Sequence, residues 1–322
     1  TAYMGSMYGM FRYISQVHNI QLDFIDEDSL TSEGLKPLNA LIITEPDIPA
    51  EGQAAIAAWV QAGGHLMSTA VAAAYDRYHR QSTVLSMATG FVEAPHERLM
   101  VQWSALLKVA ASGTGELGAI EAYGVRSSLN LSDAQQGGFH QLATFQDGTP
   151  AIVRNDAVGK GSATHFAFHP SLRFPNMNPY TGTPNFDQFD NFNDGTLPYL
   201  LDFLDNAGIK AHVTVSSQQI ETPLLVSTGG AVVSLLDWRP QDRQTPSINV
   251  TVRLNFDVAE VTAVRAGVKL HFTSVAQDGE FLISFTTDVV DCDFITLEAK
   301  QDANSFLKSN DPRAAPSVPP MH

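Results

Sequence analysis

The chain has 322 residues, 44% of them hydrophobic and 16% charged, which is long enough for two globular domains with separate cores. Its net charge of −15 disfavours nucleic acid and anionic membranes as partners and suits neutral molecules such as sugars, although a need for solubility explains the same charge. A single cysteine, Cys292, excludes an intrachain disulfide framework and a zinc site built from cysteines.

The first part of the sequence alternates between helix and strand patterns. Helices are predicted over residues 7–18 and 50–62, where apolar side chains or alanines recur at helical spacing. Strands are predicted over 20–25, 39–44 and 65–69, and Gly63-Gly64 closes the second helix before the last of them. This order predicts a parallel sheet with helices on both faces.

The middle of the sequence carries weaker patterns. Residues 80–150 contain one predicted helix, over 97–110, and several short strands with Gly-rich turns. Residues 151–154 and 162–168 predict a hairpin-like pair of strands, and a helix over 196–207 ends at Gly208.

After Gly208 the pattern changes to strands separated by short turns rich in Gly, Asp and Pro, which is typical of a β-sandwich. These strands are predicted over residues 211–216, 219–227, 231–237, 247–255, 259–265, 268–273, 280–285 and 294–298. We therefore predict an α/β, flavodoxin-like three-layer domain with a mostly parallel sheet over residues 1–212, and a β-sandwich over 213–300. Residues 301–322 are predicted to form an extended Pro-rich tail.

One strand end carries the residues of a known family. Residues 163–171 read Ala-Thr-His-Phe-Ala-Phe-His-Pro-Ser. With the strand–helix–strand units before it, this segment resembles the class I glutamine amidotransferase-like domain, in which such a strand ends in His-Pro-Glu and a cysteine nucleophile sits after another strand. Ser171 stands where the resemblance implies Glu, and Cys292 lies far downstream near the last predicted strand, where we expect a small buried hydrophobe. We therefore expect the fold without glutaminase activity.

The order of short motifs also resembles the region after the catalytic barrel in β-galactosidase-like glycoside hydrolases, namely an amidotransferase-like trimerisation domain followed by a small β-domain. The stretches that carry the resemblance are 22–28 (Leu-Asp-Phe-Ile-Asp-Glu-Asp), 58–66 (Ala-Trp-Val-Gln-Ala-Gly-Gly-His-Leu), Ala74-Tyr75-Asp76, 159–170 and 229–238. The catalytic barrel itself has no room here, because a (β/α)₈ barrel takes about 250 residues.

The N-terminal end of the predicted sheet lacks an element. A flavodoxin-like domain opens with a central strand, whereas this sequence begins almost directly at a predicted helix. We expect that Thr1 is not the natural start and that an upstream segment supplies a strand beside 20–25 or 39–44. The sequence shows no signal peptide and no apolar run of bilayer length, and it leaves the compartment undecided.

Polar side chains follow the predicted strand ends at residues 44, 69 and 168, at the edge where open α/β sheets bind ligands. The candidate catalytic residues are His169, Ser68 and Glu45, because a neighbouring His activates a hydroxyl nucleophile. No Gly-x-Ser-x-Gly elbow surrounds Ser68. The alternative is that His169 is a structural residue whose ring bonds to the backbone.

A long loop over residues 170–198 mixes aromatic side chains with Asn, Asp, Pro and Thr. Such residues stack on sugar rings and bond to hydroxyls, so the candidate ligand-binding residues are Asp76, Phe174, Tyr180, Phe189 and Asp190. The alternative is that the aromatics fasten the loop to its own domain or to a neighbouring subunit. We expect no cofactor and no metal: His165 and His169 share one strand face, yet no third ligand is identifiable by spacing.

Two classes of function remain open, and a purely structural oligomerisation unit is a third. The first is a module of a carbohydrate-active enzyme that serves assembly or sugar binding, with an upstream catalytic segment or a neighbouring subunit as partner, and homo-oligomerisation. The second is a free-standing hydrolase of ester or glycosidic bonds with a hydroxyl or carboxylate site at the sheet edge. Neither class calls for nucleic acid or a membrane.

Overall fold

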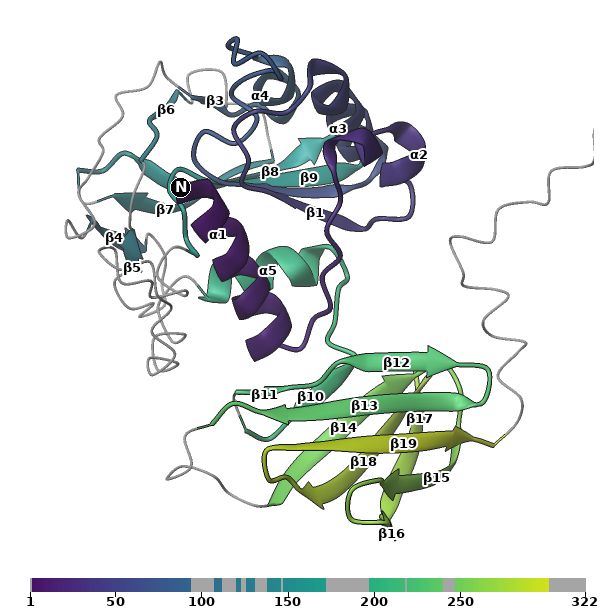
Figure 1. Cartoon of the computed structure of the whole chain (residues 1–322). Helices are drawn as coiled ribbons and strands as arrows, with labels where there is room; N and C mark the ends of the chain where they lie inside the picture. The colour runs from purple at the N-terminus through teal and green to yellow at the C-terminus, as the bar shows by residue number, and fades with distance from the viewer. Residues whose placement is uncertain are drawn as a thin grey trace, which may run out of the picture. The chain divides into compact units, whose positions relative to one another are not determined.

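The structure is a computed structural model of the chain and describes residues 2–93, 107–111, 120–122, 126–130, 138–145, 147–171, 197–217, 219–239 and 247–300 (Figure 1). It divides into two compact units. Unit 1 comprises residues 1–13 and 23–210, and unit 2 comprises 14–22 and 211–322. The α/β class of the first part and the β-sandwich of the second are both confirmed.

Unit 1 is built on a sheet with the strand order β1-β2-β9-β8-β7-β4-β5. The strands are β1 (Ala40–Ile43), β2 (His65–Ser68), β4 (Leu107–Ala111), β5 (Ile120–Ala122), β7 (Phe139–Phe145), β8 (Pro150–Val158) and β9 (Gly161–Phe166). The pairs β1–β2 and β2–β9 are parallel, whereas β9–β8, β8–β7, β7–β4 and β4–β5 are antiparallel. The sheet is thus mixed: β1, β2 and β9 form the parallel part that the sequence predicts, whereas β8, β7, β4 and β5 extend it with antiparallel strands.

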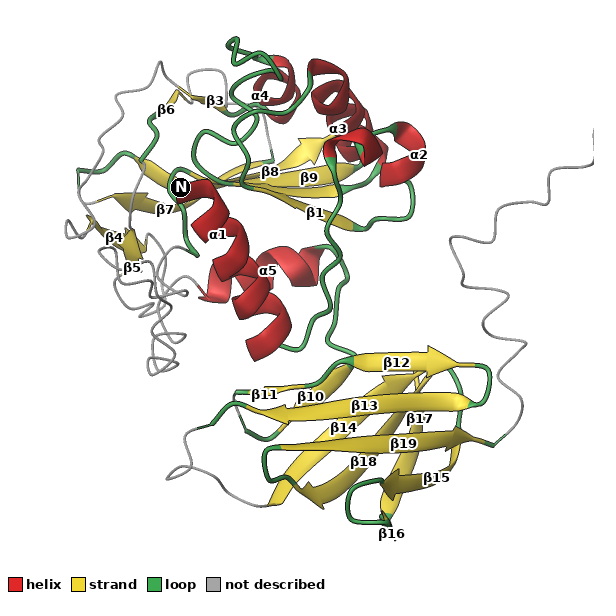
Figure 2. Ribbon diagram, in the orientation of Figure 1, coloured by secondary structure: helices red, strands yellow, loops and turns green. Residues whose placement is uncertain are grey.

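Helices cover both faces of this sheet (Figure 2). They are α1 (Ala2–Phe11), α2 (Ser32–Leu35), α3 (Ala50–Ala62), α4 (Val84–Thr89) and α5 (Leu197–Asn206). Helices α2, α3 and α4 lie on one side, and α1 and α5 on the other. Ile56 and Val60 of α3 have no exposed surface and pack with Leu66 of β2 and Val153 of β8 in one core cluster. Burial of this apolar stripe holds α3 against the sheet.

The joint between α3 and β2 requires glycine at two positions, Gly63 and Gly161. Helix α3 ends where predicted, at Gly63, whose φ of 129° favours glycine. A Cβ on Gly161 at the start of β9 would lie 2.1 Å from the Gly64 carbonyl oxygen and 2.3 Å from that of Val60. The backbones of the α3–β2 joint and β9 therefore approach so closely that only glycine fits.

Two predicted elements are wrong. Residues 20–25 form no strand: Asn19, with a φ of 56°, ends the π-helix Arg12–Val17, and Phe24 is 57% exposed. Residues 107–110 of the predicted helix 97–110 belong to strand β4 (Leu107–Ala111), which pairs with β7, so sheet pairing overrides helical spacing there. The remainder of that prediction, residues 97–106, lies outside the described residues, as does the predicted tail 301–322.

Unit 2 is a sandwich of two antiparallel sheets. One has the order β10-β14-β18-β17, and the other β11-β13-β19-β15-β16 with β12 paired to β13. The strands are β10 (Val213–Val215), β11 (Ile220–Glu221), β12 (Leu224–Ser227), β13 (Gly230–Asp237), β14 (Ser247–Leu254), β15 (Val258–Ala263), β16 (Val268–Lys269), β17 (Phe272–Gln277), β18 (Glu280–Asp288) and β19 (Cys292–Ala299). Alternate residues of β13, β14 and β19 point inward, and their Val, Leu and Ile side chains form one core.

Residues 14–22 belong to unit 2, which the predicted boundary at residue 212 did not anticipate. The Asn19 side chain accepts a hydrogen bond from the Thr222 N–H at 2.9 Å. The Gln21 amide donates to the Leu224 carbonyl oxygen, also at 2.9 Å. These bonds tie the segment to the backbone around β11 and β12.

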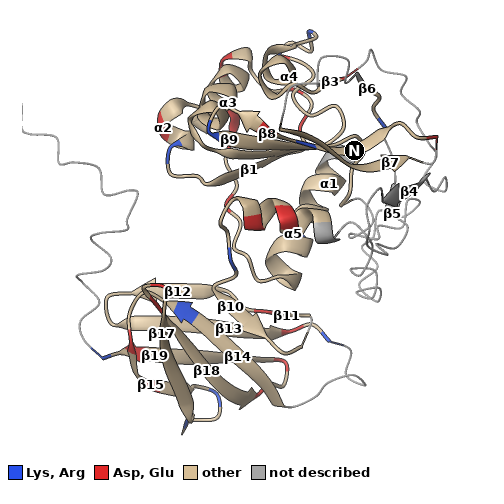
Figure 3. Ribbon diagram, turned by 180° about the vertical axis from the view of Figure 1, so that it is seen from behind, with Lys and Arg blue, Asp and Glu red and all other residues tan. Residues whose placement is uncertain are grey.

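The described charges are dispersed, and the view in Figure 3 shows no basic patch. None of the helices in the described ranges has the length and apolar character needed to cross a bilayer.

Candidate functional site

The hydroxyl of Ser68 and the imidazole of His165 meet at one level of the sheet. Ser68 ends β2 and His165 lies on the parallel strand β9, and the two residues are register partners. Ser68 Oγ and His165 Nδ1 are 2.8 Å apart, a hydrogen-bond distance, and both residues are buried. Phe91 lies beside the imidazole, with ring centroids 5.7 Å apart, and helps to fix its orientation.

A carboxylate faces the other nitrogen of this imidazole. Glu93 Oε1 lies 3.1 Å from His165 Nε2, although the ring N–H is not aimed straight at the oxygen. Glu93 belongs to the short strand β3 (Val92–Glu93). The chain reaches it from α4 through Gly90, whose φ of 80° reverses the chain direction.

The environment of Glu93 favours its ionised form. Burial raises the pKa of this carboxyl, but the imidazole of His165 and the Val71 N–H, which donates to Oε1 at 3.0 Å, together outweigh burial and lower the pKa. A carboxylate at this distance favours the tautomer that carries its proton on Nε2. In that tautomer Nδ1 accepts a hydrogen bond from the Ser68 hydroxyl, and this arrangement is the one that activates a serine.

Strained backbone supports this contact. Val71 has a φ of 65° and Ala73 a φ of 55°. The left-handed region costs a β-branched residue about 1–3 kcal/mol and persists only where surrounding structure enforces it. Here the Val71 N–H is held by Glu93, and the Ala73 N–H by the Glu45 carbonyl oxygen at 2.8 Å. The turn after β2 is therefore shaped to present an N–H to the carboxylate.

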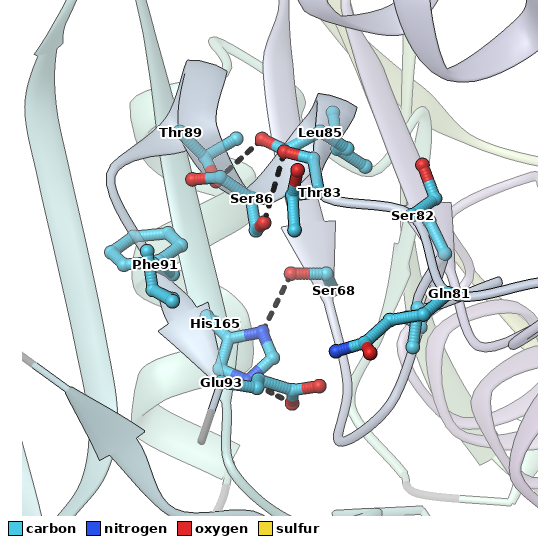
Figure 4. Close-up of a pocket in the computed structure, with 14 residues that line it drawn as sticks. Ser68, Gln81, Ser82, Thr83, Leu85, Ser86, Thr89, Phe91, Glu93 and His165 are labelled. Carbon is cyan, nitrogen blue, oxygen red and sulfur yellow. Dashed lines mark hydrogen bonds and ion pairs between the residues drawn. The ribbon is translucent and has the colours of Figure 1, made fainter. Parts of the chain in front are cut away.

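A cavity of about 50 Å³ opens beside these three residues (Figure 4). Its wall consists mainly of small and hydroxyl-bearing side chains from the turn after β2, from α4 and from β3. The lining residues are Ser68, Ala72, Ala73, Ala74, Gln81, Ser82, Thr83, Leu85, Ser86, Thr89, Phe91, Val92, Glu93 and His165. Gln81, Thr83 and Val92 are exposed, so the cavity reaches the surface along that rim.

Of the residues predicted to be catalytic, the structure brings Ser68 to this cavity but pairs it with His165, not with His169. His169 is 1% exposed, and burial lowers its pKa to about 4, with the nearby Glu93 raising it and His165 lowering it further. Glu45 does not line the cavity. Burial raises the pKa of Glu45, and the charges of Asp47 and Glu27 act in the same direction against a hydrogen bond from the backbone of Asp47.

The predicted ligand-binding residues are dispersed or undescribed. Asp76 Oδ1 accepts the N–H groups of Tyr78 and Arg80 at 2.8 and 2.9 Å, so this carboxylate shapes its own turn. Phe174, Tyr180, Phe189 and Asp190 lie outside the described residues.

Ser171, which stands where the amidotransferase resemblance implies Glu, makes a structural contact. Ser171 is fully buried, its Oγ lies 2.9 Å from the Ser6 hydroxyl, and it donates to the Ser6 carbonyl oxygen at 2.6 Å. Cys292 lies on β19 in unit 2 and is partly exposed, not fully buried as expected. Within the described residues, no three His, Cys, Asp or Glu side chains are placed to hold a metal ion.

Glu93 was missed from the sequence. Its only local signal is a single carboxylate in the apolar stretch Phe91-Val92-Glu93-Ala94, and it lies in a region without a clear helical or strand period. His165 was noticed for sharing a strand face with His169, but its partner across the sheet is visible only in the register of β2 and β9.

The fold of the chain is similar to that of solved β-galactosidases. A catalytic mutant of a GH42 β-galactosidase from G. stearothermophilus matches 93% of this chain and 37% of its own, with a TM-score of 0.64 and 12% sequence identity. The β-galactosidase from Rahnella sp. R3 matches 91% of this chain and 36% of its own, with a TM-score of 0.60 and 16% identity. The β-galactosidase from Bacillus circulans sp. alkalophilus matches 88% of this chain and 37% of its own, with a TM-score of 0.60 and 12% identity.

This chain thus spans a little over a third of the length of these β-galactosidases. No protein-family model matches the sequence, and no curated protein matches it. The similarity is therefore one of fold, and it covers a combination of an α/β unit with a β-sandwich.

Proposed function

We propose that this chain is a module of a carbohydrate-active enzyme related to the GH42 β-galactosidases, and that it serves assembly or sugar binding without cleaving glycosidic bonds by itself. The observation that carries the proposal is the extent of the fold similarity: 93% of this chain is matched, but only 37% of the β-galactosidase. The unmatched part of that enzyme is large enough for a (β/α)₈ barrel, which takes about 250 residues. Fold similarity alone does not assign the activity of the whole enzyme to this chain.

Glutaminase chemistry is not part of this role. The reaction needs a thiolate nucleophile, and Cys292 lies on β19 of the β-sandwich. Ser171, in place of the expected Glu, is bonded to Ser6.

Unit 2 offers a surface suited to assembly. Strand β12 pairs only with β13, so it is an edge strand among the described residues. Leu225 and Val226 on it are 69% and 43% exposed. An exposed apolar edge strand is prone to pair with another chain unless it is covered. The proposal is that a second copy covers it.

The test measures the mass of the chain in solution and its binding of galactose and lactose. We expect an oligomer that Leu225→Lys converts to a monomer, whereas Val264→Lys, at a turn residue that is 50% exposed, leaves the mass unchanged. We also expect no turnover of aryl-β-galactosides. The proposal is contradicted if the chain stays monomeric at every concentration and binds neither sugar. It is also contradicted if the chain hydrolyses aryl-β-galactosides on its own.

A further inference from the structure

We infer that Ser68, His165 and Glu93 form a hydrolytic site for acetyl esters, an activity beyond the module role proposed above. The three side chains come from separate elements, β2, β9 and β3, and meet in hydrogen-bond and ion-pair distances of 2.8 and 3.1 Å. Ser68 and His165 lie near the carboxyl ends of the parallel strands β2 and β9, where open α/β sheets bind ligands, and Glu93 reaches them from the separate pair of β3 with β6 (Leu129–Asn130). Figure 4 shows the His165 imidazole between the Ser68 hydroxyl and the Glu93 carboxylate.

The reaction follows from the order of these groups. Ser68 Oγ attacks the carbonyl carbon of the ester, and its proton passes to Nδ1 of His165 while Glu93 stabilises the imidazolium. The bond between the carbonyl carbon and the alcohol oxygen then breaks, and His165 returns the proton to the departing alcohol. Water attacks the acetyl-Ser68 ester in the same way, which releases acetic acid and restores the Ser68 hydroxyl.

The negative carbonyl oxygen of the intermediate needs a hydrogen-bond donor. The backbone of the turn after β2 supplies none, because the N–H groups of residues 69–74 already donate to backbone carbonyls or to Glu93. The side-chain amide of Gln81 lines the cavity and points toward the gap between Ser68 and Glu93 in Figure 4. Within the described part of the chain no bond engages this amide, so Gln81 is the residue assigned to the oxyanion.

The cavity limits the acyl group to a small one. A volume of about 50 Å³ is room for roughly three to five water-sized atoms, at about 10–15 Å³ each. An acetyl group fits this space, and Leu85 and Phe91, which are 4% and 3% exposed and belong to the core, close its inner wall, so a longer acyl chain would have to leave the cavity past its exposed rim. Apart from His165 and Glu93, the lining side chains carry no charge. The alcohol is therefore neutral, as in an O-acetylated sugar.

The same pair of strands provides a matched control. His65 Nδ1 and Ser162 Oγ are also 2.8 Å apart and also register partners of β2 and β9, but they lie at the opposite ends of the two strands and outside this cavity. Ser162→Ala removes the same kind of hydrogen bond as Ser68→Ala without touching the proposed site.

The experiment measures hydrolysis of 4-nitrophenyl acetate, butyrate and octanoate by the full chain, and mass spectrometry locates any acetylated serine. We expect kcat/KM on the acetate to fall by at least about 100-fold in Ser68→Ala and in His165→Gln, and by about 100–1000-fold in Gln81→Ala with KM little changed. Glu93→Gln should lower kcat, whereas Ser162→Ala should stay within twofold of the wild type. The acetyl group should be found on Ser68. Thermal melts verify that each variant is folded.

Two results overturn the inference. If Ser68→Ala hydrolyses the acetate as fast as the wild type, or if Ser162→Ala loses as much activity as Ser68→Ala, no activated serine exists at this site. If Ser68-dependent hydrolysis is as fast on the butyrate as on the acetate, the assignment to acetyl esters is wrong. Neither result bears on the mass or sugar-binding tests of the module role.

Discussion

Ser68 and His165 repeat, at one end of the β2–β9 pair, the contact that His65 and Ser162 make at the other end. Both hydrogen bonds measure 2.8 Å and both join register partners, but the serine and the histidine exchange strands. The difference lies in the surroundings: only the Ser68–His165 contact has Glu93 at 3.1 Å from the second ring nitrogen and a cavity beside the hydroxyl. A Ser–His bond across parallel strands is therefore not by itself a reactive group, and the carboxylate and the cavity distinguish the two ends.

His169 should make stability fall in mild acid. Its folded pKa is about 4, against 6.5 for the free side chain. The folded state thus resists protonation, so the contribution of His169 is fully present above pH 6.5 and is lost as the pH falls toward 4. The difference of about 2.5 pH units corresponds to about 3 kcal/mol of unfolding free energy. Denaturant titrations between pH 4 and 7 measure it.

The control for this prediction is His169→Gln, which cannot titrate. Carboxylates and other histidines titrate in both proteins, so the quantity of interest is the difference between their stability–pH curves. We expect the wild type to lose about 3 kcal/mol more than His169→Gln between pH 6.5 and 4. Parallel curves would mean that His169 is as easily protonated in the folded state as in the unfolded state.

Gly161→Ala should destabilise unit 1 by about 3 kcal/mol, the upper end of the usual cost of overpacking. Its Cβ would lie 2.1 and 2.3 Å from two backbone oxygens of the α3–β2 joint, and backbone atoms cannot rotate away as a side chain does. Gly229→Ala, where no heavy atom lies within 4 Å and φ is not positive, should change stability by less than about 0.5 kcal/mol. Equal melting of both variants would show that β9 shifts freely away from the joint.

The local parts of the fold could be predicted because their signals are contiguous. Helix α3 shows helical spacing and ends in two glycines, and β1 and β2 are short apolar runs, so these elements were confirmed within one residue of the prediction. The strand predicted over 20–25 failed because alternation also occurs in an extended segment: Gln21 bonds to Leu224 and Phe24 faces solvent.

The site could be predicted only in part. Ser68 follows from its place at a strand end, which is a local property of the sequence. Its pairing with His165 depends on the register between strands far apart in the chain, and Glu93 enters through the turn at Gly90. The sequence favoured His169 because it follows a strand end and precedes Pro170. In the structure this ring is buried and is not among the residues that line the cavity.

Glu45→Gln should stabilise unit 1 slightly at neutral pH and leave ester hydrolysis unchanged. The folded pKa of Glu45 is raised, mainly by burial, so its ionised form is disfavoured in the folded state. Stability linked to this group is fully present below the unfolded pKa of 4.5 and is lost as the pH rises through the folded value. Because Glu45 is exposed and solvent screens its charge, the gain at pH 7 should be roughly 0.5 kcal/mol, and it should vanish near pH 4. A variant that loses acetyl-ester hydrolysis would instead place Glu45 in the site.

Arg239→Ala should be among the most damaging substitutions in unit 2. The guanidinium makes a forked contact with Asp237, with Nε–Oδ1 and Nη2–Oδ2 distances of 2.8 and 2.7 Å, and the Asp237 side chain is 0% exposed. Removing the arginine leaves a buried carboxylate without its counter-charge, which costs about 3–5 kcal/mol. Lys269→Ala breaks an ion pair with Glu260 in which the lysine side chain is 74% exposed, so it should cost less than about 1 kcal/mol.

Adding Asp237→Asn to Arg239→Ala should recover part of the loss in denaturant titrations, because the amide carries no charge to bury. If the double variant is no more stable than Arg239→Ala, the loss comes from the packing of the arginine side chain and not from the stranded charge.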